Sequence, residues 1–273
     1  MLLAMKAVRL DILLAERGLC ASREQAKRLI LAGCVRVEGA VVDKVAARVS
    51  PEAHIEITER PQYVSRGGYK LAAALDAFGV NPAGRVAADV GASTGGFTDC
   101  LLQRGAARVY ALDVGYGQLA WELRQDPRVV VMERVNARYV ESLPEPVSLV
   151  TIDVSFISLR HILPQVARWL GPGGEVIALI KPQFEAGQRW VGKGGVVREA
   201  RVHAWVLNRL LTWAREEGWA ILGVMPSPIK GPKGNTEFLA WLARGEDRPS
   251  VDLAQAIEGA LARAREISDQ PVL

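Results

Sequence analysis

Two lysines and two acids stand where the sequence pattern places strand ends or the start of a helix. Lys181 and Asp153 each close an apolar stretch, Glu237 opens the last one, and Lys70 lies on a helix near the start of the larger part of the chain. A hydroxyl is a poor nucleophile while it keeps its proton, so a site that uses one must remove that proton or stabilise the developing oxyanion. A lysine beside a second cation can have its pKa lowered enough to act as the base. The group therefore suits methyl transfer to a ribose 2′-hydroxyl.

The stretch DVGASTGGFTDC, residues 89–100, permits three interpretations. It fits the elbow of a serine hydrolase, and it nearly fits the dinucleotide-binding pattern G-x-G-x-x-G. The third interpretation is the glycine loop of a methyltransferase that binds S-adenosylmethionine. A hydrolase needs a histidine beyond the serine, but only His161 and His203 come later, and neither is expected on a loop at a strand end. The dinucleotide pattern fails at Ser93, where a glycine must let the backbone approach a pyrophosphate that S-adenosylmethionine lacks.

Two polar residues at later strand ends favour S-adenosylmethionine. Asp113 follows the glycine loop by about twenty residues, where a carboxylate can accept hydrogen bonds from both ribose hydroxyls of an adenosine. Asn136 has the donor and the acceptor that the adenine edge requires, although a turn at this point explains it equally well. Because the sulfonium of this cofactor carries an already activated methyl group, the reaction needs no metal.

The elements that must position these residues alternate between strands and helices from residue 64 onward. Strands are expected at residues 86–90, 109–114, 129–133, 147–154, 175–182, 219–227 and 236–244, with helices between most of them. This alternation predicts a Rossmann-like α/β fold with a mostly parallel sheet, covered on both faces, and with ligands beyond the carboxyl ends of its strands. The loop between the last two strands is too short for a helix, so the last strand should run antiparallel.

Residues 8–59 form a separate small α+β module in this interpretation. Its second helix opens at Ser22, with Gln25 completing a capping box, and a strand hairpin turns at Glu38 and Gly39. Long cations gather on its helices, where they suit either phosphate contacts or a solvated surface. We predict RNA contacts for Arg9, Arg17, Arg23, Lys27 and Arg28 and, on loops beside the site of the larger domain, for Lys193, Arg198, Lys230 and Lys233.

The composition excludes several classes of protein. Hydrophobic residues make up 49% of the 273 residues, enough for a buried core, and the net charge of +4 allows a polyanionic partner without identifying it. The three cysteines have no paired spacing, which argues against disulfides and a zinc site. Lys6 and Arg9 interrupt the amino-terminal stretch too soon for a signal peptide, and no run of about 18 apolar residues could span a membrane. We therefore expect a soluble cytoplasmic protein, with Trp169, Trp205 and Trp213 mostly in the core.

Longer strings of sequence resemble known families. RLDILLAERGLCASREQAKRLILAGCVRVEG resembles the RNA-binding module first seen in the fourth protein of the small ribosomal subunit. The group of Lys70, Asp153, Lys181 and Glu237 resembles the Lys-Asp-Lys-Glu tetrad of the FtsJ-type ribose methyltransferases. Similarity to the hemolysin A (TlyA) family extends over nearly the whole chain, in the strings VSRGGYKL, DVGASTGGFTDCLL, DVGYGQLAW, VVMERVNAR, DVSFISL, IKPQFEAG, GKGGVV and GNTEFL.

This resemblance implies methylation of the 2′-hydroxyl of cytidine in ribosomal RNA, in the large subunit and in some members also the small. Lys181 would be the central base, with Asp153, Lys70 and Glu237 supporting it. The implied contacts to S-adenosylmethionine are Gly91, Ser93, Thr94, Gly95, Gly96, Phe97, Asp113, Asn136 and Asp153. The implied partner is ribosomal RNA or a ribosomal subunit, with no metal and no membrane. The implied domains are an RNA-binding domain at residues 1–59, a linker at 60–65, a methyltransferase domain at 66–246 and a carboxyl-terminal helix and tail at 247–273.

Two alternative functions belong to other classes of protein. A membrane-lytic haemolysin would need a long apolar or strongly amphipathic segment, and none is evident in the sequence. An RNA-binding protein with an inactive methyltransferase fold would have no chemical reason to keep two lysines and two acids at the strand ends. The tetrad therefore favours an enzyme.

Overall fold

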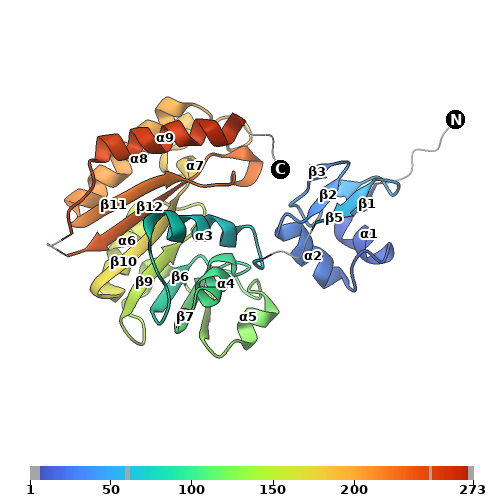
Figure 1. Cartoon of the computed structure of the whole chain (residues 1–273), viewed down its shortest axis with the longest axis horizontal. Coiled ribbons are helices and arrows are strands. Elements are labelled where there is room, and N and C mark those ends of the chain that lie inside the picture. The colour runs from blue at the N-terminus through green and yellow to red at the C-terminus, as the bar shows by residue number, and fades with distance from the viewer. Residues whose placement is uncertain (1–6, 59–61, 246–247, 270–273) are drawn as a thin grey trace. The chain divides into compact units, whose positions relative to one another are not determined.

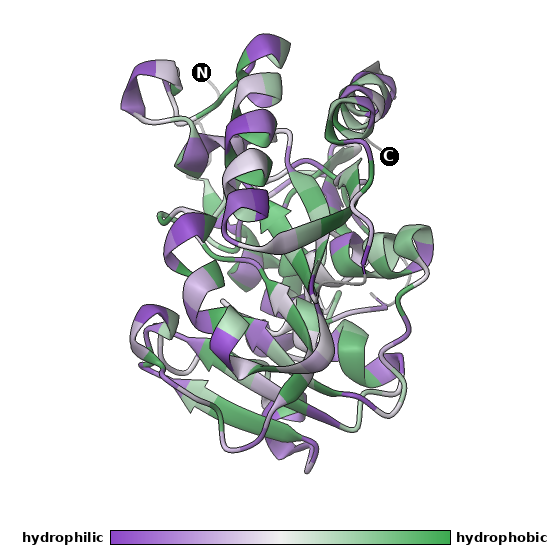
Figure 2. Cartoon of the chain, turned by 90° about the vertical axis from the view of Figure 1, so that its left-hand side faces the viewer, coloured by the Kyte–Doolittle hydropathy of each residue, from purple (hydrophilic) through white to green (hydrophobic). Residues whose placement is uncertain are grey.

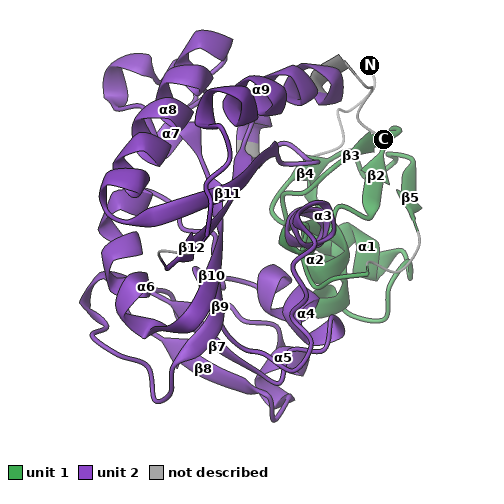
Figure 3. Cartoon of the chain, turned by 60° about the vertical axis from the view of Figure 1, so that its left-hand side comes forward, with its two compact units in different colours: residues 1–68, 271–273 green, residues 69–270 purple. Residues whose placement is uncertain are grey.

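The computed structural model describes residues 7–58, 62–245 and 248–269. The chain divides into two compact units, one with the residues up to Gly68 and the other running from Tyr69 (Figure 3). The predicted linker at 60–65 lies just ahead of this division, but its residues 60 and 61 fall outside the described residues, as do 246, 247 and 270–273 near the predicted carboxyl-terminal tail. The predicted domain limits therefore stay a prediction.

The smaller unit consists of two helices and short antiparallel strands. Its elements are β1 (Val8–Arg9), α1 (Leu10–Glu16), α2 (Arg23–Leu31), β2 (Val35–Val37), β3 (Ala40–Val41), β4 (Arg48–Val49) and β5 (Ile55–Ile57). β1 pairs with β4, and β2 lies between β3 and β5. The predicted cap of α2 is confirmed, because the Gln25 amide donates to Oγ of Ser22 at 3.1 Å. Leu10, Leu14 and Ile30 are fully buried and form the centre of the core of this unit.

A seven-stranded sheet forms the centre of the larger unit (Figure 1). Its strands are β6 (Val86–Val90), β7 (Arg108–Asp113), β8 (Val129–Glu133), β9 (Val147–Ile152), β10 (Leu170–Ile180), β11 (Trp219–Pro226) and β12 (Phe238–Arg244). Their order across the sheet is β11-β12-β10-β9-β6-β7-β8. Neighbouring strands from β10 to β8 run parallel, whereas β12 is antiparallel to both β10 and β11. The predicted fold class, a mostly parallel sheet with an antiparallel last strand, is confirmed.

Helices cover the sheet of the larger unit. They are α3 (Gly67–Phe78), α4 (Gly96–Gln103), α5 (Trp121–Gln125), α6 (Leu163–Trp169), α7 (Pro182–Glu185), α8 (Ala200–Glu216) and α9 (Leu253–Asp269), with the 3-10 turns η1 (Ala137–Tyr139), η2 (Leu159–His161), η3 (Gln188–Trp190) and η4 (Pro232–Gly234). The last four residues of β6 and of β9 are all buried, as expected for strands covered on both faces. Figure 2 shows hydrophobic residues on the strands and hydrophilic residues on outward turns of the helices.

The strand β10 begins earlier than the sequence predicts. It starts at Leu170 instead of near Glu175, and Leu170 pairs with Val147 of β9. The register then shifts before Glu175, where the sequence Gly-Pro-Gly-Gly intervenes. An irregularity of this kind absorbs extra residues within a strand, so the glycines lengthen β10 instead of ending it.

Two helices also differ from expectation. Among the helices expected between the strands, the one that the pattern GQLAWELRQD predicts at 117–126 is reduced to α5. The amide of Ala120 donates instead to the carbonyl of Thr94 in the glycine loop at 3.0 Å. The short helix α7 was not predicted. Pro182 is its first residue, a position at which the missing N–H costs no hydrogen bond. Lys181 before it is extended, with φ of −107°, as expected for a residue that precedes a proline.

Among the residues that the structure describes, no helix is both long enough and apolar enough to cross a membrane. The same residues contain no group of three or more His, Cys, Asp or Glu side chains placed to hold a metal ion.

Candidate active site

The glycine loop joins β6 to α4 through backbone conformations that depend on glycine. Gly91 has φ of +86°, and a Cβ atom there would lie 2.6 Å from the carbonyl oxygen of Asp153. Gly95 has φ of +101°, and a Cβ atom there would lie 2.3 Å from the side chain of Leu123. Between them Ser93 also has a positive φ, of 50°. The loop therefore passes close to the end of β9 and turns sharply into α4.

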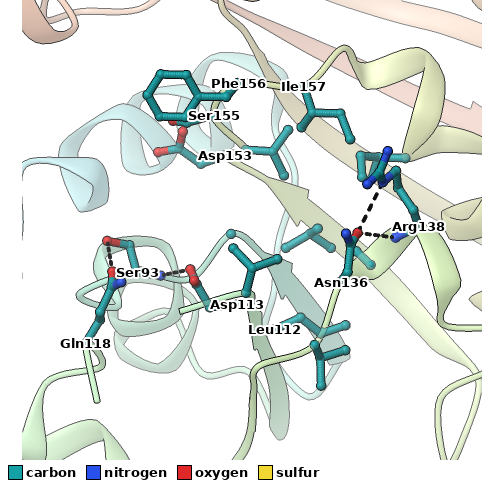
Figure 4. A pocket seen from close by; sticks show the side chains of 17 residues that line it. Ser93, Leu112, Asp113, Gln118, Asn136, Arg138, Asp153, Ser155, Phe156 and Ile157 are labelled. Carbon is teal, nitrogen blue, oxygen red and sulfur yellow. Dashed lines mark hydrogen bonds between the residues drawn. The ribbon is translucent and has the colours of Figure 1, made fainter. Parts of the chain in front are cut away.

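A pocket of about 450 Å³ lies beside this loop, beyond the carboxyl ends of β6, β7 and β9. Five predicted cofactor residues line it, namely Gly91, Ser93, Asp113, Asn136 and Asp153 (Figure 4). Its wall also contains residues that the sequence analysis did not select, among them Val114, Gln118, Arg138, Ser155, Phe156 and Ile157. These six lie one to five residues beyond the predicted strand-end residues, and all fall within the strings DVGYGQLAW, VVMERVNAR and DVSFISL. Their position and this resemblance are the sequence signals that could have found them.

Asp113 is fixed in the pocket by two backbone amides. Its Oδ2 accepts from the amide of Ser93 at 2.7 Å, and its Oδ1 accepts from the amide of Gly115 at 2.7 Å. Each carboxylate oxygen has a further lone pair. The side chain is therefore held in one orientation and still has acceptor capacity for the hydroxyl groups of a ligand.

Asn136 has one of the two roles that the sequence left open. Its Oδ1 accepts from the amide of Arg138 at 3.1 Å and so caps η1 (Figure 4). The residue also lines the pocket. The turn-forming role is present in the structure, and a contact with adenine stays a prediction.

Four predicted cofactor residues are not part of the wall of this pocket. They are Thr94, Gly95, Gly96 and Phe97. Phe97 is buried, with 3% of its surface exposed, and the carbonyl of Thr94 accepts from Ala120. These residues shape the loop and the start of α4, and their contact with a cofactor stays a prediction.

The predicted tetrad forms two ion pairs. Nζ of Lys181 lies 2.5 Å from Oδ1 of Asp153 and donates to Oγ of Ser155 at 2.9 Å. Nζ of Lys70, on α3, donates to Oε2 of Glu237 at 2.6 Å. The side chain of Glu237 is fully buried and that of Lys70 is 9% exposed.

Strand register places the two pairs at one edge of the sheet. Ile180 of β10 pairs with Phe238 of β12, so Lys181 and Glu237 are the next residues along these antiparallel neighbours. On the other side of β10, Ala178 pairs with Ile152 of β9, which Asp153 follows. The sheet therefore gathers residues of three adjacent strands at the edge beside the pocket.

Glu237 is confined by a glycine that the sequence analysis missed. A Cβ atom on Gly231 would lie 2.0 Å from Oε1 of Glu237. This oxygen is buried and has no hydrogen-bond partner among the described residues. Nothing in the loop sequence SPIKGPKGN distinguishes Gly231 from a flexible loop glycine. The need for a glycine arises only in the folded protein, where the loop packs against the side chain of Glu237.

A second missed residue is Asp89, in the middle of the sheet. It is fully buried, and it accepts hydrogen bonds from the hydroxyls of Thr98, in α4, at 2.7 Å and of Thr151, in β9, at 3.2 Å. Burial raises the pKa of this carboxyl to about 7, and the negative charge of Asp153 acts in the same direction. Asp89 thus links the helix after the glycine loop to β9, the strand that Asp153 follows.

Phe156 is an exposed aromatic residue at the pocket. It is 90% exposed, and its φ of 65° is unusual for a bulky residue. Its ring centroid lies 5.0 Å from that of Phe184, three residues after Lys181. Figure 4 shows it beside Ser155 and Asp153. Strain and exposure in one residue at a candidate site suggest a ligand contact.

Four of the predicted RNA-binding cations of the smaller unit, Arg9, Arg17, Arg23 and Lys27, have partners within it. Arg9 and Arg23 both pair with the buried Asp11, at 2.9 Å and 2.7 Å, and the hydrogen bond from Arg9 is the main reason why the pKa of Asp11 falls to about 2. Arg17 donates to the carbonyl of Ala53 at 2.7 Å, and Lys27 pairs with Glu24 at 2.8 Å. The side chains of Arg9 and Arg23 are 38% and 51% exposed, so both remain accessible to solvent although they pair with Asp11.

The predicted RNA-binding loops of the larger unit are fastened to each other by Asn235. Its Nδ2 donates to the carbonyl of Gly195 at 3.0 Å, and its Oδ1 accepts from the amide of Val197 at 3.1 Å. The loop with Lys193 and Arg198 therefore lies against the loop with Lys230 and Lys233. RNA contacts of these four cations stay a prediction.

The fold and this edge of the sheet define a class of protein. A mostly parallel sheet with one antiparallel strand, and with a pocket beyond the carboxyl ends next to lysine–carboxylate pairs, is a Rossmann-like methyltransferase. Residues 63–244 match the model of the FtsJ-like methyltransferase family, and residues 8–55 match that of the S4 domain. The chain belongs to the FtsJ-like methyltransferases and carries an S4 domain at its amino terminus.

Similar proteins cover nearly the whole chain. The 16S/23S rRNA (cytidine-2′-O)-methyltransferase TlyA of Mycobacterium tuberculosis is 46% identical over 270 residues, which span 97% of this chain and 99% of that protein. Hemolysin A of Brachyspira hyodysenteriae is 42% identical over 236 residues, or 85% of this chain and 98% of that protein. A solved structure described as a "Putative hemolysin from Streptococcus thermophilus" has 44% identity and a TM-score of 0.76, and the match covers 97% of this chain and 98% of that one.

Proposed function

We propose that this protein transfers the methyl group of S-adenosylmethionine to the ribose 2′-hydroxyl of cytidine in ribosomal RNA. The observation that carries the proposal is the placement of two lysine–carboxylate pairs at one sheet edge, beside a pocket lined by the glycine loop. The TlyA protein of Mycobacterium tuberculosis, whose name states this activity, supports the choice of cytidine and of ribosomal RNA.

The pocket suits S-adenosylmethionine by its donor and acceptor set. Asp113 has acceptor capacity for the two ribose hydroxyls of an adenosine, and its fixed orientation lowers the entropic cost of that contact. Gly91 keeps the loop backbone next to the carbonyl of Asp153, where a side chain would intrude. When bound, S-adenosylmethionine supplies a methyl group that its sulfonium has already activated.

Lys181 is the proposed base. Asp153 and Ser155 hold its Nζ in a fixed position at this edge of the sheet. In its unprotonated form this amine takes the proton of the 2′-hydroxyl as the oxygen gains the methyl group. The resulting ammonium lies next to the Asp153 carboxylate, which stabilises it.

The pair of Lys70 and Glu237 is proposed to orient the substrate ribose. Both side chains are almost completely buried, so their charges can be kept there only by contact with each other. The carboxylate of Glu237 is buried, so its proposed task is to hold Lys70, whose side chain is 9% exposed. The ammonium of Lys70 places a positive charge near the developing oxyanion.

RNA is the proposed partner because both units carry lysine or arginine side chains that can contact phosphates. The S4 domain exposes parts of Arg9 and Arg23, and the loops joined by Asn235 carry Lys193 and Lys233 in the same unit as the tetrad. Arginine and lysine contacts with phosphates supply affinity that depends on salt but little on sequence. The choice of nucleotide then depends on the site that holds the ribose.

The test is methyl transfer from labelled S-adenosylmethionine to ribosomal subunits and to naked ribosomal RNA, with the modified nucleotide mapped. The wild-type protein should label a cytidine 2′-oxygen, and Lys181→Ala should abolish turnover while S-adenosylmethionine still binds. Binding of the cofactor without transfer to any of these RNAs would contradict the proposal and favour an RNA-binding protein with an inactive methyltransferase fold.

A further inference from the structure

Helix α8 carries alternating arginine and tryptophan side chains on one side. Arg201, Trp205, Arg209 and Trp213 follow one another at intervals of four residues, which aligns them along the helix. We call these four residues the Arg–Trp stripe. Trp205 is 37% exposed, so the sequence-based expectation that it lies in the core is wrong, whereas Trp169 is buried as expected, with 2% exposed.

Arginines of the stripe and of the neighbouring η2 lie against its indole rings. Cζ of Arg209 lies 5.0 Å from the ring centroid of Trp205, and Cζ of Arg160, from η2, lies 5.3 Å from that of Trp213. Arg160 also donates from Nη2 to the carbonyl of Arg209 at 2.8 Å. A guanidinium over an aromatic ring keeps N–H edges available for other acceptors, so these arginines are preorganised donors.

The stripe continues onto η3. The ring centroid of Trp190 lies 6.5 Å from that of Trp205. Cζ of Arg189 and of Arg201 lie 5.3 Å and 5.9 Å from the centroid of Trp190. Trp190 and Trp213 pack partly against the core, which fixes the two ends of this row of indoles. Arg201 and Arg209 lie between these two ends, on a surface that has no role in the proposed methyl transfer.

A pocket of about 220 Å³ adjoins the stripe. Arg160, His161 and Arg209 line it together with Ser158 and Glu185. Glu185 is the acid of this pocket, but its two oxygens already accept from the hydroxyl of Ser158 at 2.7 Å and from the amide of Leu159 at 2.8 Å. These bonds hold the carboxylate in one orientation, but its charge still acts on Arg160 and His161. With Arg160 and Arg209 against this one acid, the pocket keeps an excess of positive charge for an anion.

We propose that the Arg–Trp stripe and this pocket bind the sugar-phosphate backbone of RNA outside the methylation site. The inference rests on the proposed function and names a second surface for the same partner. Arginine edges suit phosphate oxygens, and the exposed indole of Trp205 suits stacking with a base or sugar. The exposed acid Glu199 is paired with Arg201 at 2.5 Å and offsets only one of the charges.

The stripe is joined by α7 to the sheet edge that carries Lys181. This helix begins directly after Lys181 and ends at Glu185, which holds the start of η2 through Ser158 and Leu159. An RNA strand bound by Arg160 and Arg209 would therefore contact elements that are fixed to this lysine. Binding at the stripe should orient RNA rather than change the chemistry.

The test compares Arg201→Gln/Arg209→Gln in the full-length protein with Arg215→Gln, which removes an exposed charge from the same helix away from the stripe. The dissociation constant for a ribosomal RNA fragment is measured at several salt concentrations. The double variant should bind on the order of tenfold more weakly, and its slope of log affinity against log salt should fall by about 1 for each phosphate that the two arginines neutralise. At saturating RNA its turnover should equal that of the wild-type protein.

Two outcomes would overturn the inference. One is a double variant whose affinity and salt slope match those of Arg215→Gln. The other is a defect that appears with assembled ribosomal subunits but not with naked RNA, since it would assign the stripe to a ribosomal protein. If the wild-type protein binds RNA through the stripe but methylates none, the proposed function fails while this inference survives.

Discussion

Lys70 and Glu237 are 167 positions apart in the chain and form a buried ion pair with 2.6 Å between Nζ and Oε2. α3 supplies the lysine, and the residue before β12 supplies the acid. Glu237 directly precedes Phe238, and the register partner of Phe238 is Ile180, which directly precedes Lys181. The first helix of the larger unit is in this way tied to its last strand at the edge where Lys181 lies.

Glu237→Ala should destabilise the protein and abolish methyl transfer. Removal of one partner leaves Lys70 buried and uncompensated, which costs about 3 to 5 kcal/mol in the free energy of unfolding. Denaturant titration and the transfer assay measure the two effects. The matched control is Lys70→Met/Glu237→Leu, which should recover much of the stability but none of the activity. An active double variant would show that the pair only supports the fold.

Gly231→Ala should lower activity through Glu237 alone. The new Cβ would lie 2.0 Å from Oε1, so the carboxylate must move and its bond to Lys70 must weaken. We expect turnover to fall while the affinity for S-adenosylmethionine, measured by calorimetry, stays near the wild-type value. Gly259→Ala in α9 is the control, since the nearest atom to its Cβ position is a flexible arginine nitrogen at 3.6 Å. Equal turnover in both variants would contradict this role of Gly231.

Asp113→Ala should weaken binding of S-adenosylmethionine. A hydrogen bond to a charged group contributes about 1.5 to 3 kcal/mol, so the dissociation constant should rise by about one to two orders of magnitude. Asp126→Ala removes an acid that pairs with Arg128 outside the pocket and should leave the constant unchanged. Similar affinity in the two variants would remove Asp113 from the cofactor site.

Asp89 should make stability depend on pH between about 4 and 7. Its folded pKa, raised to about 7, exceeds its unfolded value, so in this window the folded protein holds a proton that the unfolded chain has lost. The free energy of unfolding should therefore fall with rising pH, by about 1.4 kcal/mol per unit from this residue. In urea titrations, the free energy of unfolding of Asp89→Asn should no longer show this fall with pH. The exposed control variant Glu258→Gln should still show it. An unchanged slope in Asp89→Asn would mean that Asp89 is ionised throughout.

Sequence patterns predict the site where strand ends determine it. Lys181, Asp153 and Asp113 could be found because an apolar run ends at a polar residue, and parallel strands bring such ends to one edge. Gly231 and Asp89 could not be found in this way. The role of Gly231 depends on the approach of its loop to the buried carboxylate of Glu237, and that of Asp89 depends on hydroxyls from two separate elements. Residues that meet in this way are not related by any regular spacing in the sequence.

The same limit explains Trp205. Tryptophans at helical spacing usually belong to a core, and in α8 the core is formed instead by Val206, Leu207, Leu210 and Leu211. The tryptophan lies one position away from that group along the chain. Because both sides of the helix contain large apolar residues, periodicity alone does not decide which side is buried.

The close approach of Gly91 to the carbonyl of Asp153 has a consequence for how variants of this enzyme can arise. A side chain at residue 91 would displace the end of β9 together with the glycine loop, so cofactor affinity and proton transfer would change in one mutational step. The two properties are therefore not separately adjustable at this position. Under the proposed function, a lineage that needed a different balance between them would have to alter it elsewhere, at Asp113 for the cofactor or around Ser155 for Lys181.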